Sequence, residues 1–218
     1  MNDAVNSFLF VYAGLFPIVN PVGGAPLFLV LTQHATASER HRLAARVAIN
    51  GFVLLLGSLL VGSHVLEFFG ITLPVVRVGG GLVVIAFAWR LLNANEPVDD
   101  RDSAVDGARP RPPLDAFYPL TMPLTVGPGS ISVAITLGSQ RPRVLENNWE
   151  LALIGAGALA GILAIAVTIF LCYRFAERIV ATLGASGTNV LMRLSAFILL
   201  CIGIQIVWNG YSALMAHQ

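Results

Sequence analysis

The sequence contains two apolar segments that combine helix-breaking residues with small polar side chains, a combination suited to binding a small ligand. The first covers residues 16–26 and reads FPIVNPVGGAP, and the second covers residues 122–130 and reads MPLTVGPGS. Each proline removes a backbone donor and clashes with the preceding helical turn, so neither segment can form one continuous helix. A helix that restarts after such a break presents free N–H groups and the positive end of its dipole, which together attract a carboxylate.

The residues expected to bind this ligand come from both segments and from the threonines that flank the second. The glycines allow close approach of a ligand to the backbone, so valine at Gly24 or Gly129 is expected to block the site. Carbonyls freed by the prolines suit an ammonium group or a sodium ion. The predicted substrate-binding residues are Asn20, Pro21, Gly23, Gly24, Thr121, Thr125, Gly127, Pro128, Gly129 and Ser130. The alternative is that both segments are merely kinked helices, which membrane proteins tolerate.

The composition indicates that these segments lie in a lipid bilayer. The chain is 56% hydrophobic and 11% charged, with a mean hydropathy of +0.77, whereas soluble domains are roughly 25% charged. An apolar stretch of about 20 residues crosses a hydrocarbon core of about 30 Å. Six such stretches cover residues 7–31, 43–69, 73–92, 117–139, 149–173 and 190–215. The expected fold is therefore an all-α integral membrane protein with six transmembrane helices, of which the first and fourth are broken.

A polar stretch divides the six spans into two groups of three. Residues 93–114 contain five acidic residues and four prolines, a composition typical of an extended or disordered linker. The expected organisation is a three-helix repeat at 1–92, a cytoplasmic linker at 93–114 and a second three-helix repeat at 115–218. An odd number of spans per repeat makes the two repeats inverted in the membrane. Weak internal similarity agrees with this, because Pro21 aligns with Pro128 at an offset of 107 residues.

The basic residues, all 13 of which are arginine, predict the orientation. Nine lie in the loops of one face: Arg40, Arg42, Arg46, Arg90, Arg101, Arg109, Arg111, Arg174 and Arg178. The loops of the other face contain Arg141 and Arg143. The positive-inside rule then places the richer face in the cytoplasm and both termini outside. Tyr173 is expected in an interfacial aromatic belt and Leu199 at the lipid surface. No nucleic-acid partner is expected.

Two arginines lie inside the expected spans. Arg77 and Arg193 are each about four residues from a span end, a depth from which a long side chain can reach the headgroups. Glu67 and Glu177 end neighbouring spans on the same faces, so the sequence predicts two ion pairs, Glu67–Arg77 and Glu177–Arg193. Because charges in a membrane are usually paired, a structural or gating role is expected for these four residues. The alternative is that either arginine binds the substrate carboxylate directly.

The chain resembles the MarC or NAAT family of neutral amino acid transporters, which includes SnatA-like proteins. The matching residues are Asn20-Pro21, 70–74, Arg77, 79–81, 119–123, 127–129, Arg193-Leu194, Gly203, Gln205 and Asn209-Gly210. Together they cover most of both halves. The resemblance implies a six-span protein of a bacterial inner membrane, with some members linked to transport of glycine, alanine and similar amino acids. It does not imply drug efflux, although the family is named after antibiotic resistance.

The function expected is therefore secondary transport of small neutral amino acids by alternating access around the two breaks. The alternative is a non-transport membrane scaffold or a stress-related assembly protein. Catalysis is not expected, because no Asp lies within a span and no His lies near Ser130 in the sequence. No cofactor or metal site is expected, while Na⁺ or H⁺ remains open as a coupling ion. The direction of transport and the oligomeric state are also left open.

Overall fold

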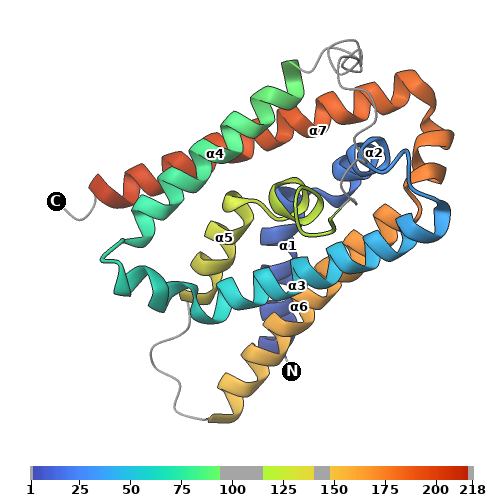
Figure 1. The fold of residues 1–218 in the computed structure, drawn as a ribbon. Coiled ribbons are helices and arrows are strands. Elements are labelled where there is room, and N and C mark those ends of the chain that lie inside the picture. The colour runs from blue at the N-terminus through green and yellow to red at the C-terminus, as the bar shows by residue number, and fades with distance from the viewer. Residues whose placement is uncertain (1, 94–114, 140–147, 216–218) are drawn as a thin grey trace.

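The computed structural model describes residues 2–93, 115–139 and 148–215, in which two layers of long helices enclose shorter ones (Figure 1). Nearly all of the predicted linker at 93–114 lies outside these ranges. The helices are α1 (Asn2–Val19), α2 (Pro21–Leu31), α3 (Ala37–Phe68), α4 (Leu73–Asn93), the π-helix η2 (Leu120–Thr125), α5 (Pro128–Ser139), α6 (Asn148–Arg174) and α7 (Ala176–Met215).

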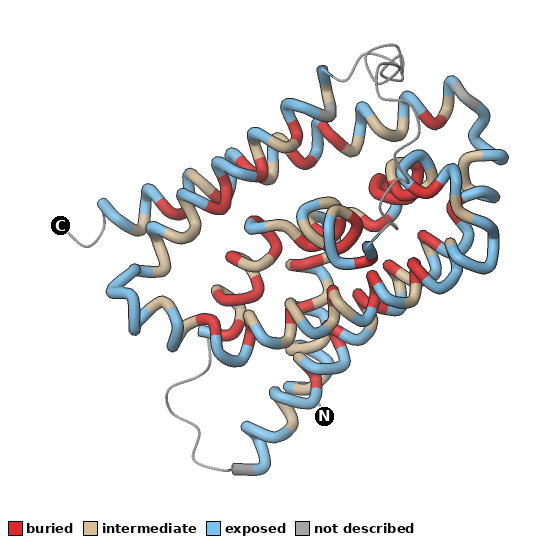
Figure 2. The backbone as a smooth tube through the Cα atoms, viewed as in Figure 1, coloured by how far each residue is buried: buried red, intermediate tan, exposed pale blue. Residues whose placement is uncertain are grey.

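Four of these helices are long and apolar enough to cross a membrane, namely α3, α4, α6 and the part of α7 from Ser186 to Met215. α1 and α2 form a fifth candidate if they are counted as one span bent by 40°. The outward faces of the long helices are largely exposed (Figure 2) and carry apolar side chains, such as Val53 of α3, Leu163 of α6 and Phe197 of α7. These features agree with an all-α membrane protein. The sixth span and the inverted repeats remain predictions.

The first break occurs where the sequence predicts it, between α1 and α2. Pro21 is the first residue of α2, a position where its missing N–H costs no hydrogen bond. Asn20 has the left-handed conformation (φ 44°, ψ 57°), which asparagine adopts more readily than most residues. Its Oδ1 accepts a hydrogen bond from the Gly23 N–H at 3.2 Å and so caps the new helix.

The second break is longer and less regular than the first. Two half-helices are expected there, but the first is replaced by the single π-helical turn of η2, in which Met122 is non-helical (φ −118°, ψ 122°). Thr121 and Thr125 stabilise this turn, because each hydroxyl donates to the carbonyl five residues earlier at 2.7 Å. Val126 is extended, and α5 begins at Pro128.

Two layers of long helices enclose the broken segments. α4 packs along α7 in one layer, and α3 packs on α6 and α1 on α6 in the other. α2, η2 and α5 lie between these layers (Figure 1). Small residues bring α4 and α7 into backbone contact: a Cβ on Gly81 would lie 2.9 Å from the Gly203 carbonyl oxygen. Such close approach is characteristic of helix pairs in membranes, where small residues form the interface.

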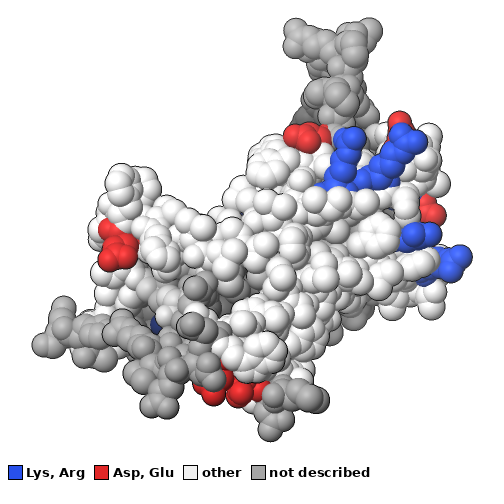
Figure 3. Space-filling view, turned by 90° about the horizontal axis from the view of Figure 1, so that it is seen from below, with Lys and Arg blue, Asp and Glu red and all other residues white. Residues whose placement is uncertain are grey.

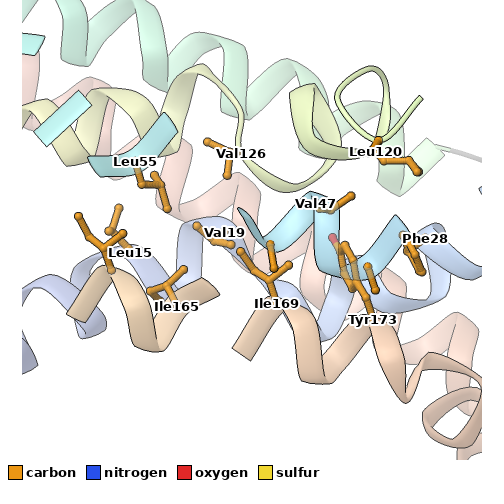
Figure 4. Packing of buried hydrophobic residues seen from close by; sticks show 14 of the residues in the cluster. Leu15, Val19, Phe28, Val47, Leu55, Leu120, Val126, Ile165, Ile169 and Tyr173 are labelled. Atoms are coloured by element: carbon orange, nitrogen blue, oxygen red, sulfur yellow. The ribbon is translucent and has the colours of Figure 1, made fainter. Parts of the chain in front are cut away.

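The main core joins α1, α2, α3, α6 and the second break (Figure 4). Tyr173 of α6 lies in this core and is 1% exposed, so its predicted place in an aromatic belt is wrong. Its ring stacks on Phe28 of α2 with 4.5 Å between ring centroids, and its hydroxyl is 2.8 Å from Thr125 Oγ1. Tyr173 thus connects the helix that follows the first break to the π-helix of the second.

The termini of the long helices gather at two ends of the molecule, and each end has its own contacts. At one end, Arg40 of α3 donates to the Thr32 carbonyl after α2 and pairs with Glu177 of α7. At the other end, the C-terminus of α3, the start of α4 and the end of α5 surround a small cavity lined by Glu67 and Ser139. Most of the basic side chains visible in Figure 3 gather toward one end of the molecule, where α2 ends and α3 begins.

Candidate functional site

A cavity of about 880 Å³ lies between the two breaks and the α4–α7 pair. α2 and α5 contribute their first turns to its wall, and the loop between η2 and α5 contributes its backbone. α4 and α7 close the opposite side with apolar residues and a few polar ones. Segments more than 100 residues apart in the sequence therefore meet at one cavity.

Most of the predicted substrate-binding residues line this cavity. From the first break these are Asn20, Gly23 and Gly24; from the second they are Thr125, Gly127, Pro128, Gly129 and Ser130. Two predicted residues are not among the lining residues. Pro21 is buried, and Thr121 is fully buried, with its hydroxyl donating to Ala116 and accepting from Asn50 at 3.4 Å. Thr121 therefore supports the π-helix and does not face the cavity.

The polar side chains at the cavity wall also stabilise the broken backbone. Asn20 caps α2 through its Oδ1. The Ser130 hydroxyl donates to the Gly127 carbonyl at 2.9 Å, and the Thr125 hydroxyl donates to the Leu120 carbonyl. The Thr125 oxygen then accepts the hydroxyl proton of Tyr173. Oxygen lone pairs remain for a ligand, but the hydroxyl hydrogens of Thr125 and Ser130 already have partners.

Three of the four predicted site glycines are needed for helix packing. A Cβ on Gly23 would lie 2.6 Å from the Ser195 side chain, and one on Gly24 would lie 2.7 Å from the Tyr173 hydroxyl. A Cβ on Gly129 would overlap a methyl group of Val84. Gly127 differs, because the nearest atom to its Cβ would be the Pro123 carbonyl oxygen at 3.4 Å. Among these four glycines, Gly127 is the one that can take a side chain without displacing a neighbour.

The predicted ion pairs are not formed. Glu177 pairs with Arg40 instead of Arg193, because the first turns of α7 lie beside the start of α3, before the break in α7 at Gly184. Arg77 donates from its Nε to Thr136 Oγ1 at 3.3 Å and not to Glu67, which is exposed at the small cavity. Among the described residues, the prediction of two symmetry-related pairs is therefore wrong. Arg193 lines the central cavity.

Sequence reasoning missed the contribution of α4 and α7 to the cavity. Their lining residues include Val84, Phe87, Arg90, Thr188, Asn189, Met192, Ser195 and Leu199. The predicted sixth span began at Val190 and so excluded the polar run at 186–189, which was the available signal. Leu199 was expected to face lipid but is 6% exposed. α4 and α7 lack an internal proline break near the cavity, so apart from this polar run and the alternative role considered for Arg193 nothing local marked them as part of a site.

Comparison with known proteins places the chain in a family. A model of the MarC family of integral membrane proteins matches residues 5–215. The chain is 29% identical to the UPF0056 membrane protein YvbG of Bacillus subtilis, over 92% of both chains. It is 30% identical to the UPF0056 inner membrane protein MarC of Salmonella typhimurium, over 90% of both. It is 28% identical to a UPF0056 membrane protein of Pyrococcus abyssi, over 96% of both. No solved structure gives a significant match. The chain belongs to the MarC family of integral membrane proteins.

Proposed function

We propose that the protein is a secondary transporter of small neutral amino acids and that the 880 Å³ cavity binds the substrate. One observation carries the proposal: two breaks from different halves of the chain converge on a single cavity, as expected for a transporter site built from discontinuous helices. The first turn of α5 presents N–H groups to a carboxylate. At the start of α2, Pro21 has no N–H and the N–H groups of Gly23 and Gly24 donate to Asn20, so α2 contributes the positive end of its helix dipole. Neutral oxygens of Asn20 and Ser130 offer acceptors to the ammonium group.

The helix contacts support a transport cycle built on two inverted repeats. α2 of the first half packs against α6 and α7, and α5 of the second half packs against α3 and α4. If α2 corresponds to α5, α3 to α6 and α4 to α7, then the contacts of α2 correspond to those of α5. The α3–α6 and α4–α7 contacts then each join two corresponding helices. On this proposal η2 and α5 together form the sixth span. Rocking of one half against the other would expose the site to each side of the membrane in turn.

The proposed orientation places the arginine-rich end in the cytoplasm. Val30 near the end of α2, Arg90 near the end of α4 and Val180 near the start of α7 extend the cavity wall toward that end. We therefore expect both termini outside, and a reporter fused after Gln218 should be active as a periplasmic enzyme and silent as a cytoplasmic one. Activity of the cytoplasmic reporter alone would contradict this orientation and the inverted arrangement derived from it.

Gly127→Val tests the cavity as the substrate site. A Cβ on Gly127 would have the Pro123 carbonyl oxygen, at 3.4 Å, as its nearest neighbour, and Gly127 lines the cavity and has no positive φ that would strain valine. Valine also suits the extended conformation preferred before a proline. We expect uptake of labelled glycine and alanine into proteoliposomes to fall at least tenfold, because the side chain occupies the space in front of α5.

Gly79→Val is the matched control. A Cβ on Gly79 has no heavy atom within 4 Å, and this residue does not line the cavity. Its uptake should equal that of the unmodified protein. Equal uptake by a stably folded Gly127→Val protein would exclude the cavity as the substrate site. Absence of both uptake and amino acid binding in the unmodified protein would instead favour the membrane scaffold.

A further inference from the structure

The charged residues of the central cavity all have the same sign. Arg90 of α4 and Arg193 of α7 line it, and no Asp or Glu is among the described residues of its wall. A zwitterionic substrate carries one positive and one negative group. Only the negative group meets a full opposite charge in this cavity, so the two ends of such a substrate are recognised unequally.

Arg193 has no protein partner among the described residues, in contrast with most other described arginines. Arg40 pairs with Glu177, Arg77 donates to Thr136, and the guanidinium of Arg174 lies 5.7 Å from the centroid of the Phe170 ring. Arg193 is exposed and follows the polar run at 186–189 by four residues, or about 6 Å of helix. A guanidinium inside a span is costly unless it is paired, hydrated or in reach of the headgroups. The cavity in front of it supplies the space for an anionic partner.

The groups available to a substrate ammonium are neutral, and each already makes one hydrogen bond within the protein. The hydroxyls of Thr125, Ser130 and Thr188 each donate to a backbone carbonyl within their own segment. Asn20 Oδ1 accepts from the Gly23 N–H. Their remaining lone pairs make neutral hydrogen bonds, which are about half as strong as charge-assisted ones. The ammonium group therefore contributes less to binding than the carboxylate.

The rest of the cavity wall suits an apolar group larger than a methyl. Leu27 of α2, Val84 and Phe87 of α4, and Met192 and Leu199 of α7 face this space. A cavity of about 880 Å³ lies within the range of roughly 300–1,000 Å³ that holds drug-sized ligands. Glycine or alanine fills a small part of it, so an apolar chain of several carbons can be accommodated beside the carboxylate.

We propose that the cavity recognises small apolar monocarboxylates, with Arg193 as the residue that selects the carboxylate and with the α-ammonium group dispensable. The proposal rests on the cavity being the substrate site, as argued above. It extends the ligand class from neutral amino acids to their des-amino counterparts. Arg193 provides a planar guanidinium that can hold a carboxylate through two parallel hydrogen bonds.

The test compares three ligands with the same branched carbon chain on the purified full-length protein. These are L-valine, its des-amino counterpart 3-methylbutanoate, and L-valinamide with its amine protonated, each measured by calorimetric titration. We expect 3-methylbutanoate to bind within tenfold of L-valine and L-valinamide to bind at least 100-fold more weakly. Arg193→Gln should weaken both acids at least tenfold, while Arg193→Lys should retain part of the affinity. Arg46→Gln, on the exposed surface of α3, should bind as the unmodified protein does.

The outcomes distinguish this inference from the proposed function. Binding of L-valine without binding of 3-methylbutanoate would overturn the inference and leave amino acid transport intact. Binding of L-valinamide as tight as that of L-valine would also overturn it. If the protein binds none of L-valine, alanine and glycine, the proposed function itself is contradicted. If Arg193→Gln does not fold, the Arg193→Lys protein and the three-ligand comparison still decide the question.

Discussion

Gly129→Ala is expected to destabilise the protein severely, and adding Val84→Ala is expected to restore most of the lost stability. A Cβ on Gly129 would overlap Val84 Cγ2, whereas the next contacts, to Val84 Cβ and the Gly80 carbonyl oxygen, lie at 3.5 and 3.7 Å. Removing the Val84 methyl groups therefore leaves an ordinary packing distance. Overpacking of a core costs about 1–3 kcal/mol and sometimes more, so the single variant should show a much lower thermal midpoint in detergent.

Comparing Gly129→Ala with the double variant also shows whether Gly129 is needed for packing or for ligand binding. Gly57→Ala is the matched control, because nothing lies within 4 Å of a Cβ at this exposed position of α3, and it should unfold near the temperature of the unmodified protein. Strictly additive losses in the double variant would show that Val84 is not the group displaced. The sequence suggested that a larger residue at Gly129 would block a substrate. The structure indicates that it would first push α5 away from α4.

The breaks could be predicted from the sequence because their cause is local. Proline lacks an N–H and excludes a continuous helix wherever it lies deep in an apolar segment, and the Asn20-Pro21 pair fixes the start of α2. The positions of the four long candidate spans also follow from hydropathy. The form of the second break cannot be predicted from hydropathy or from the prolines. It depends on hydroxyl-to-carbonyl bonds made by Thr121 and Thr125 within one π-helical turn.

Contacts between helices were beyond sequence reasoning, since hydropathy does not tell which face of a helix meets which neighbour. Tyr173 lies near a span end, as belt residues do, yet it points into the core beside Phe28. Glu177 was paired with Arg193 because both were expected at the same membrane face, on neighbouring spans. The fold brings Arg40 to it instead, after α2 and α3 turn back on each other. The same limitation concealed the contribution of α4 and α7 to the cavity.

The second large effect is expected at Gly24, where Tyr173→Phe should rescue Gly24→Ala. A Cβ on Gly24 would lie 2.7 Å from the Tyr173 hydroxyl, while the nearest ring carbons lie at 3.4 and 3.5 Å. The added methyl must displace the hydroxyl and with it the Tyr173–Thr125 hydrogen bond and the stacking on Phe28. Thermal unfolding of the single variant should therefore show a loss comparable with overpacking elsewhere in cores, about 1–3 kcal/mol.

Tyr173→Phe alone removes one hydrogen bond, worth about 1 kcal/mol, and leaves the Thr125 hydroxyl bonded to the Leu120 carbonyl. In the double variant the methyl group added at Gly24 meets only ring carbons at ordinary distance, so the combined loss should be smaller than the sum of the single losses. A double variant as unstable as that sum would show that the hydroxyl is not the obstacle. If the Tyr173→Phe protein folds but transports slowly, the hydroxyl bond between α6 and η2 contributes to the transport cycle. The reason is that the Tyr173 side chain contacts both breaks: its ring stacks on Phe28 of α2, and its hydroxyl bonds to Thr125 of η2.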